Sequence, residues 1–238
     1  MPNSRALVIK SIKNGESSLI VTCYLEKFGL KSFIVKGVYG VKKSKFNKSL
    51  FFPLNILSIN FNDNNKSLSY LKEAKSEIFF ESLYFNIEKS SIIIFISEVL
   101  NSVLKEDTGH NKDLFNFIIS SLLWYDKIKT CNSFHIKFMV ELTKFIGFYP
   151  NIEQEDDEFF CLISGSSSNA KPKEKHISGK EFKLFKQILG TNFEDLSIIE
   201  IDNKLRIKML NYIIDYYSLH LQLFKTPKSI DVFAKIFR

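Results

Sequence analysis

The first part of the chain carries short stretches rich in Val, Ile, Leu, Phe and Tyr, separated by turn residues such as Asn14-Gly15. These stretches predict five strands, at residues 5–13, 17–26, 31–37, 53–61 and 67–74. In the fourth stretch Leu54, Ile56 and either Leu57 or Ile59 compete for the inward face, so its alternation is imperfect. Five short strands within about seventy residues favour a small closed or nearly closed β-barrel such as the OB-fold.

From Glu77 the hydrophobic period changes to three and four residues, which is typical of packed helices. The pattern predicts helical stretches at residues 72–90, 91–106, 112–129 and 133–148. Ser178 and Glu181 form a capping box for another helix, and Thr226-Pro227 begins a last helix over residues 228–237. The chain is therefore expected to be an α+β multidomain protein: an OB-fold barrel over residues 1–78, then an all-α domain over residues 79–238, with a loop-rich insertion at about residues 150–178.

Charge is unevenly distributed along the chain. Residues 1–50 hold ten Lys and Arg against two acidic residues, a net charge of +8, whereas the whole chain carries +7, which leaves −1 for the other 188 residues. A strongly basic module on a near-neutral scaffold indicates a polyanionic partner. Nucleic acid is the commonest partner of this kind, and an anionic membrane is the main rival.

The cysteines and the apolar stretches indicate the cellular compartment in which we expect the protein. Three widely separated cysteines do not make a disulfide framework and favour a reducing cytoplasm. The N-terminus lacks the apolar run of a signal peptide, and the most apolar stretch falls far short of the roughly 20 uncharged residues of a membrane span. We expect a cytoplasmic protein, and a nucleoid-associated one if the polyanion is DNA.

Signals of catalysis are scarce. The sequence has no phosphate-cradling glycine motif of the usual kinds and no nucleophile elbow, and its four histidines show no zinc spacing. The acidic residues Glu153, Asp156 and Asp157 lie in a cluster that lacks the spaced pattern of a calcium loop, so a solvated turn is favoured over a metal site. We expect no enzyme activity and no cofactor.

The basic run is the strongest signal for function. No Asp or Glu occurs from Lys27 to Asn62, while seven lysines do. Lysines along a groove can neutralise phosphates, and aromatic rings such as Tyr39, Phe46, Phe51 and Phe52 can stack on unpaired bases. The alternative is that the aromatic residues belong to the core or its rim and the lysines only solubilise a loop.

Two parts of the sequence resemble the RecO family of bacterial recombination mediators. The N-terminal part has a Gly-Glu-Ser turn at residues 15–17, a Thr22-to-Gly29 segment, a Lys36-Gly37 pair that opens a basic loop, and Pro53-Leu54 before the next strand. The C-terminal "YYSLHLQLFKTPKSIDVFAKIF" is similar to that family's closing helix, basic link and final helix. The resemblance covers nearly the whole chain, and its two ends are the specific parts.

The resemblance implies an N-terminal OB-fold, a helical C-terminal domain, and no catalytic residue. It also implies binding to single- and double-stranded DNA, annealing of complementary strands, cooperation with RecR, contact with the acidic tail of the single-stranded DNA-binding protein, and indirectly the loading of RecA. Our hypothesis for the DNA surface comprises Lys36, Tyr39, Lys42, Lys43, Lys45 and Lys48, supported by Arg5 and Lys10. The pocket for the tail stays unassigned, with Lys137, Arg206 and Lys208 among the candidate cations.

This chain departs from the family in two places. Many members carry a four-cysteine zinc site in the insertion, whereas this chain keeps only Cys161 there, so we predict a degenerate insertion without zinc. Tyr39 stands where basic residues are common, which exchanges a phosphate contact for a stacking surface. Three other functions stay open: an OB-fold RNA-binding protein, a metal-dependent nuclease using the acidic cluster, and a lipid-surface protein, which the loop position of the lysines disfavours.

Overall fold

The computed structural model describes residues 2–39, 45–62, 68–106, 109–129 and 131–230. The described residues fall into two compact units, one within residues 2–120 with 227–229, and one within residues 121–226 with residue 230. The division lies within helix α2 (Lys112–Lys127). The domain boundary expected after residue 78 stays a prediction, since the first unit holds helix α1 (Ile87–Val103) together with the strands.

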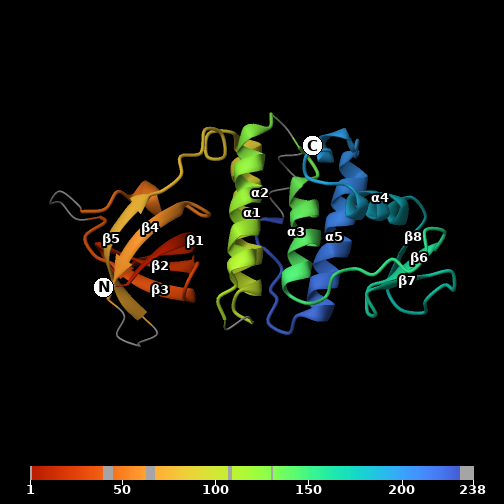
Figure 1. Cartoon of the computed structure of the whole chain (residues 1–238), viewed down its shortest axis with the longest axis horizontal. Helices are drawn as coiled ribbons and strands as arrows, with labels where there is room; N and C mark the ends of the chain where they lie inside the picture. Colours follow the sequence, from red (N-terminus) through yellow and green to blue (C-terminus); the bar gives the residue numbers. More distant parts are fainter. Residues whose placement is uncertain (1, 40–44, 63–67, 107–108, 130, 231–238) are drawn as a thin grey trace. The chain divides into compact units, whose positions relative to one another are not determined.

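The first unit contains the barrel that the sequence predicts (Figure 1). Its strands are β1 (Asn3–Asn14), β2 (Ser18–Leu25), β3 (Gly29–Val35), β4 (Ile56–Phe61) and β5 (Leu68–Ser76). Their order, β1-β2-β3-β5-β4 closing on β1, is that of an OB-fold barrel. All pairs are antiparallel except β3 with β5, which are parallel.

The barrel interior is filled by alternate residues of each strand. Val21 of β2 faces Phe33 of β3 in the register, and both are almost fully buried. A bulge between Val8 and Lys10 shifts the register of β1 against β2, so the outward row on β1 passes through Lys10. The strand register thereby decides which residues of the basic segment reach solvent.

A short 3-10 helix, η1 (Lys48–Phe51), lies between β3 and β4, and its N-cap Asn47 accepts a hydrogen bond from the backbone N–H of Ser49. The Oγ of Ser11 donates to the backbone oxygen of Phe51 at 2.6 Å, which fastens η1 to β1. The fourth strand begins at Ile56 and not at residue 53, because Leu54 has a φ of 60° and forms a turn. The lysine loop thus ends on a fixed turn of the barrel.

The helical stretch predicted at residues 72–90 is wrong. Strand β5 continues to Ser76, and α1 begins at Ile87, with Asn86 as its N-cap. In the intervening segment Phe80 and Leu83 are buried without forming a helix, whereas Phe79 and Phe85 are 86% and 80% exposed. The helices predicted at residues 91–106 and 112–129 are confirmed as α1 and α2, with bounds that differ by a few residues.

The second unit is mainly helical. It contains α3 (Phe134–Phe145), which confirms the helix predicted at residues 133–148, and then α4 (Gly179–Gly190), η2 (Leu196–Ile198) and α5 (Asn203–His220). Ser178 is the N-cap of α4 as predicted, but its side chain makes no capping hydrogen bond. The predicted last helix lies outside the described residues except at its start. Each described helix is too short or too polar to cross a bilayer.

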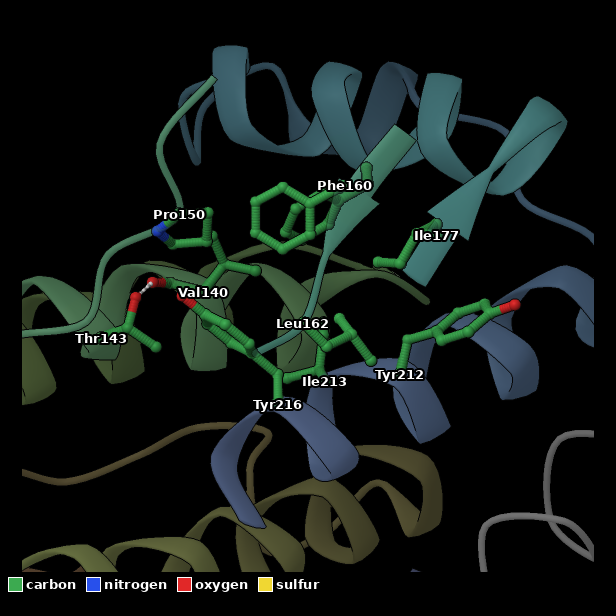
Figure 2. A pocket seen from close by; sticks show the side chains of 10 residues that line it. Val140, Thr143, Pro150, Phe160, Leu162, Ile177, Tyr212, Ile213 and Tyr216 are labelled. Atoms are coloured by element: carbon green, nitrogen blue, oxygen red, sulfur yellow. Dashed lines mark hydrogen bonds between the residues drawn. The ribbon is translucent and has the colours of Figure 1, made fainter. Parts of the chain in front are cut away.

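The insertion holds a small sheet in the order β7-β6-β8, formed by β6 (Phe159–Cys161), β7 (Ser166–Ser168) and β8 (His176–Ser178). Phe160 of β6 packs at 5.0 Å, between ring centroids, from Phe185 of α4. Figure 2 shows Phe160 and Ile177 of the sheet at a cavity that Tyr216 of α5 also lines, and this cavity of about 10 Å³ is too small for a ligand. The sheet is therefore a packed part of the helical unit.

Candidate nucleic-acid interface

Lysines lie over exposed tyrosine rings on the barrel. Lys36 follows the end of β3, and its Nζ lies 4.7 Å from the ring centroid of Tyr70 on β5. The two residues are close because Ile34, two positions before Lys36, pairs with Tyr70 in the parallel register. Tyr70 is 41% exposed, so the ring and the cation over it are both partly accessible to a ligand.

The amines of two lysines lie near the ring of Tyr39. The Nζ atoms of Lys13 and Lys48 are each 5.4 Å from its ring centroid. The backbone N–H of Tyr39 donates to the oxygen of Ser17 in the β1–β2 turn at 3.1 Å, which holds this part of the loop against the barrel. Three segments of the basic region therefore meet at one exposed ring, which is 37% exposed.

The other residues of the hypothesis occupy different environments. The Nζ of Lys45 donates to the backbone oxygen of Lys72 at 2.6 Å, which ties the loop to β5 while the lysine stays exposed. Lys42 and Lys43 lie outside the described residues. The structure thus places Lys36, Tyr39, Lys45 and Lys48 on segments that contact one another or β5.

Arg5 and Lys10, both on β1, differ from each other. The Nε of Arg5 lies 2.7 Å from Oε1 of Glu77, and its guanidinium carbon lies 5.5 Å from the ring centroid of Phe115. Its charge is therefore shared with a carboxylate. Lys10 is exposed and pairs with Thr22 on the outer face of the barrel, where its charge is open to solvent.

The sequence identified only some of the aromatic surface. Phe46 and Phe51 are 6% and 2% exposed and belong to the barrel core, so their expected stacking role is wrong. Phe52 is 45% exposed and contacts the ring of Tyr84. The sequence did not point to Tyr70. Its position beside Lys36 depends on the register between β3 and β5, and the alternation of residues within one strand does not reveal that register.

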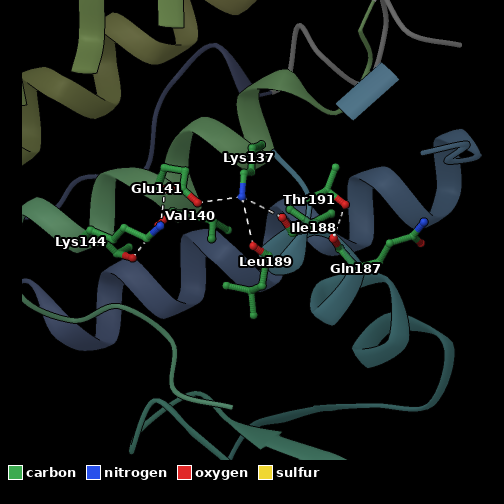
Figure 3. Close-up of polar contacts among 9 residues, drawn as sticks. Lys137, Val140, Glu141, Lys144, Gln187, Ile188, Leu189 and Thr191 are labelled. Carbon is green, nitrogen blue, oxygen red and sulfur yellow. Dashed lines mark hydrogen bonds and ion pairs between the residues drawn. The ribbon is translucent and has the colours of Figure 1, made fainter. Parts of the chain in front are cut away.

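The cations considered for partner binding in the helical unit are either buried or paired with a carboxylate. Lys137 is 3% exposed, and Figure 3 shows its amine donating to Glu141 and to the backbone oxygens of Ile188 and Leu189. These carbonyls lie at the end of α4, so Lys137 caps that helix. Two further candidates are Arg206, which is 2% exposed, and Lys208, which pairs with Glu181.

The same unit has an open cavity of about 690 Å³. Its lining combines apolar side chains with one cation and one carboxylate: Tyr149, Pro150, Ile152, Leu189, Lys186 and Glu155. The Nζ of Lys186 donates to the backbone oxygens of Glu155 and Asp157 at 2.6 and 3.1 Å. An apolar cavity with a cation in its wall can hold the end of an acidic, apolar peptide, although Glu155 offsets the charge of Lys186.

Asp157 of the acidic cluster is held in its turn by hydrogen bonds. Asp157 is 5% exposed and accepts hydrogen bonds from the Oγ of Ser167 and from the backbone N–H of Gln154, the latter at 3.1 Å. Within the part of the chain that the structure describes, no three His, Cys, Asp or Glu side chains are grouped to hold a metal ion. The structure therefore gives no support to the nuclease alternative.

Comparisons with known proteins agree with this architecture. The family model "Recombination protein O N terminal" matches residues 1–79, and "Recombination protein O C terminal" matches residues 84–229. The chain belongs to the RecO family. Relatives named "DNA repair protein RecO" include those of Flavobacterium psychrophilum, 35% identical, and Flavobacterium johnsoniae, 34% identical, each over 98% of this chain and 98% of the relative. The RecO of Christiangramia forsetii is 33% identical over 99% of this chain and 98% of its own length.

Membership of the RecO family makes this chain a DNA repair protein of the barrel-plus-helices type. The resemblance drawn from the two ends of the sequence is confirmed, since the matches extend through the weak middle region.

Proposed function

We propose that this chain is a DNA-binding recombination mediator that binds single- and double-stranded DNA and anneals complementary strands. The observation that carries the proposal is the set of lysine amines over exposed tyrosine rings, Lys36 over Tyr70 and two lysines over Tyr39. Cations bind phosphates, and open aromatic faces accept bases that are not paired. Annealing needs both the cations and the aromatic rings, because two strands must come together while their bases stay unpaired.

Annealing requires that phosphate repulsion falls while the bases stay free to pair. Lys36, Lys45 and Lys48 are exposed, and each lies on a segment fastened to the barrel. They hold positive charge at the surface without closing over a strand. We include Lys42 and Lys43 of the same loop, Tyr39, and Lys10 on the outer face, and we expect Arg5 to contribute least, because it is paired with Glu77.

The test is a charge-neutralising variant with a matched control. Replacing Lys36, Lys45 and Lys48 with Gln should weaken DNA binding and annealing, and should make the log–log salt dependence on single strands shallower by about 2, at about 0.7 per phosphate contact. The control replaces the exposed Lys171, Lys173 and Lys183 of the helical unit, which removes the same charge. Equal affinity and salt slope in both variants would contradict the proposal.

Phosphate contacts carry no base code, so the loss should be similar across sequences. A competition between RNA and single-stranded DNA separates the remaining alternative. If RNA displaces DNA at much lower concentration, the barrel is an RNA-binding surface.

We further propose that the chain acts with RecR and with the single-stranded DNA-binding protein to help load RecA, in association with the nucleoid. The mixed cavity of the helical unit supports capture of an acidic, apolar tail. Ile152→Asp should abolish saturable binding of a labelled tail peptide to the full chain, whereas Ile198→Asp, at a site 74% exposed in the same unit, should not. Tail binding unaffected by Ile152→Asp would rule out this cavity.

An annealing assay on strands coated with the cognate single-stranded DNA-binding protein tests DNA contact and partner handling together. The wild-type chain should anneal coated strands, and the Ile152→Asp variant should anneal only bare ones. Equal activity of that variant on both substrates would separate annealing from tail capture.

A further inference from the structure

A row of apolar side chains crosses four strands of the barrel, with exposed residues at its two ends and half-buried ones between them. The register pairs Ile12 of β1 with Ile20 of β2, Ile20 with Ile34 of β3, and Ile34 with Tyr70 of β5. We call these four residues the apolar row. Successive strands lie about 4.8 Å apart, so the row is about 14 Å long.

The apolar row lies on the outside of the barrel. Residues adjacent to it along the strands, such as Val21 and Phe33, belong to the core, and side chains alternate between the two faces of a strand. Ile12 is 49% exposed and Tyr70 is 41% exposed. A contiguous exposed apolar surface on a folded unit commonly marks a binding surface.

Polar and basic side chains border the row. On one side the paired Lys10 and Thr22 are continued by Ser32, and the hydroxyl oxygens of Thr22 and Ser32 are 3.0 Å apart. On the other side is Lys36, with its amine 4.7 Å from the centroid of the Tyr70 ring. The row is therefore an apolar strip with a cation at each border.

We propose that the apolar row holds unpaired bases, with Tyr70 as the residue that selects single strands over duplex. This inference rests on the proposed function, because it assumes that the barrel binds DNA. A single strand can lay its base faces along the row while its phosphates run past Lys10 and Lys36. A duplex buries its base faces in its own stack and offers only phosphates and groove edges, so it gains from the lysines but not from the row.

Charge argues against a second copy of this chain as the occupant. A symmetric pair would place the same surface on both sides of the interface and would bring the lysines bordering one row towards those bordering the other. Like charges placed opposite each other are unfavourable at an interface. A polyanion matches the border lysines, whereas a second copy does not.

The test measures single-strand and duplex affinity separately. Tyr70→Ser should lower affinity for a single-stranded oligonucleotide about tenfold, as expected for the loss of one stacked base, and should change duplex affinity by less than about twofold. Tyr70→Phe keeps the ring and should retain the preference for single strands. Ile12→Thr should lower single-strand affinity less than Tyr70→Ser, because it removes no ring. Phe79→Ser, at a residue 86% exposed but outside the row, is the matched control and should leave both affinities unchanged.

A spectroscopic variant gives a second readout. Tyr70→Trp should show fluorescence quenching on addition of single-stranded oligonucleotide and none on addition of duplex, with the native Trp124 signal of the unsubstituted chain as the background. The salt dependence of Tyr70→Ser should equal that of the wild-type chain, because no cation is removed.

Three results would overturn the inference. These are an equal proportional loss on single strands and duplex, no loss on either, or a change from dimer to monomer in Tyr70→Ser without loss of single-strand affinity. The proposed function fails separately, if the variant lacking Lys36, Lys45 and Lys48 binds DNA as well as its charge-matched control.

Discussion

Replacing Lys137 with Met tests how the helical unit is held together. The Lys137 amine lies 2.7 Å from Oε1 of Glu141, and 3.0 and 3.2 Å from the backbone oxygens of Ile188 and Leu189. Its side chain is 4% exposed, whereas that of Lys144, the second partner of Glu141, is 46% exposed. One carboxylate thus has a buried cation and a surface cation, which gives a matched pair of variants.

The magnitude follows from these contacts. A hydrogen bond to a charged group contributes about 1.5–3 kcal/mol, and breaking a buried ion pair costs about 3–5 kcal/mol. Glu141 keeps Lys144 as a partner, and Met fills much of the space of the lysine stem, so we expect Lys137→Met to lower the free energy of unfolding by about 3 kcal/mol. Lys144→Met should cost less than about 1 kcal/mol, because solvent screens the exposed pair.

Thermal unfolding followed by circular dichroism measures the difference. At about 2–4 °C per kcal/mol for a chain of this size, Lys137→Met should lower Tm by about 6–12 °C, and Lys144→Met by no more than about 4 °C. Equal shifts in the two variants would refute the reasoning, because the buried capping bonds to α4 would then contribute nothing. Tail-peptide binding that survives in Lys137→Met would agree with a structural role for this lysine.

The same carboxylate gives a dependence on pH. Burial raises the pKa of Glu141, but the hydrogen bonds and charges of Lys137 and Lys144 outweigh burial and leave the pKa below its ordinary value. A carboxyl group with a lowered pKa in the folded state contributes stability above its unfolded pKa, and this contribution is lost as pH falls through the folded pKa. The acid loss of stability should therefore be smaller in Glu141→Gln than in the wild-type chain.

Three further predictions concern other parts of the fold. Burial, with the charge of Arg206, lowers the pKa of His135 to about 3, so stability should fall by about 2 kcal/mol between pH 7 and pH 5, and His135→Gln should flatten this slope in urea titrations. Gly29 and Gly37 both have positive φ, but a Cβ on Gly29 would lie 2.7 Å from a backbone oxygen and one on Gly37 would meet open space. Gly37→Ala should cost about 1 kcal/mol and Gly29→Ala clearly more, and equal costs would show that the close contact does not matter. Cys161 is half-exposed and the other cysteines are buried, so one thiol should react quickly with a thiol reagent in the native protein and none in Cys161→Ser.

Local sequence patterns determined the classes of the elements. The strand-like stretches correspond to β1–β5, and the helical period correctly predicted α1, α2 and α3 with shifted ends. The pattern failed at residues 72–90, where apolar residues at helical spacing belong partly to β5 and partly to a non-helical segment in which Phe80 and Leu83 are buried. Periodicity does not distinguish these cases, because pairing with β4 and β3 comes from residues far away in the sequence.

The candidate site is also only partly visible in the sequence, which shows its lysines but not which aromatic rings are exposed. The density of lysines in residues 27–62 is visible in the sequence, and it led to Lys36, Lys45 and Lys48. The local pattern does not distinguish Phe46 and Phe51 from Tyr39 as stacking surfaces, although of these three only Tyr39 is exposed.

The amino-acid pattern specifies a basic barrel segment and the order of the strands and helices. The folded barrel brings Tyr70 beneath the amine of Lys36 and makes it continue a row that begins at Ile12. Hydrophobic alternation fixes only which side of its own strand a residue occupies. The neighbours of that residue on other strands depend on the register and on the parallel closure of β3 with β5, which are non-local.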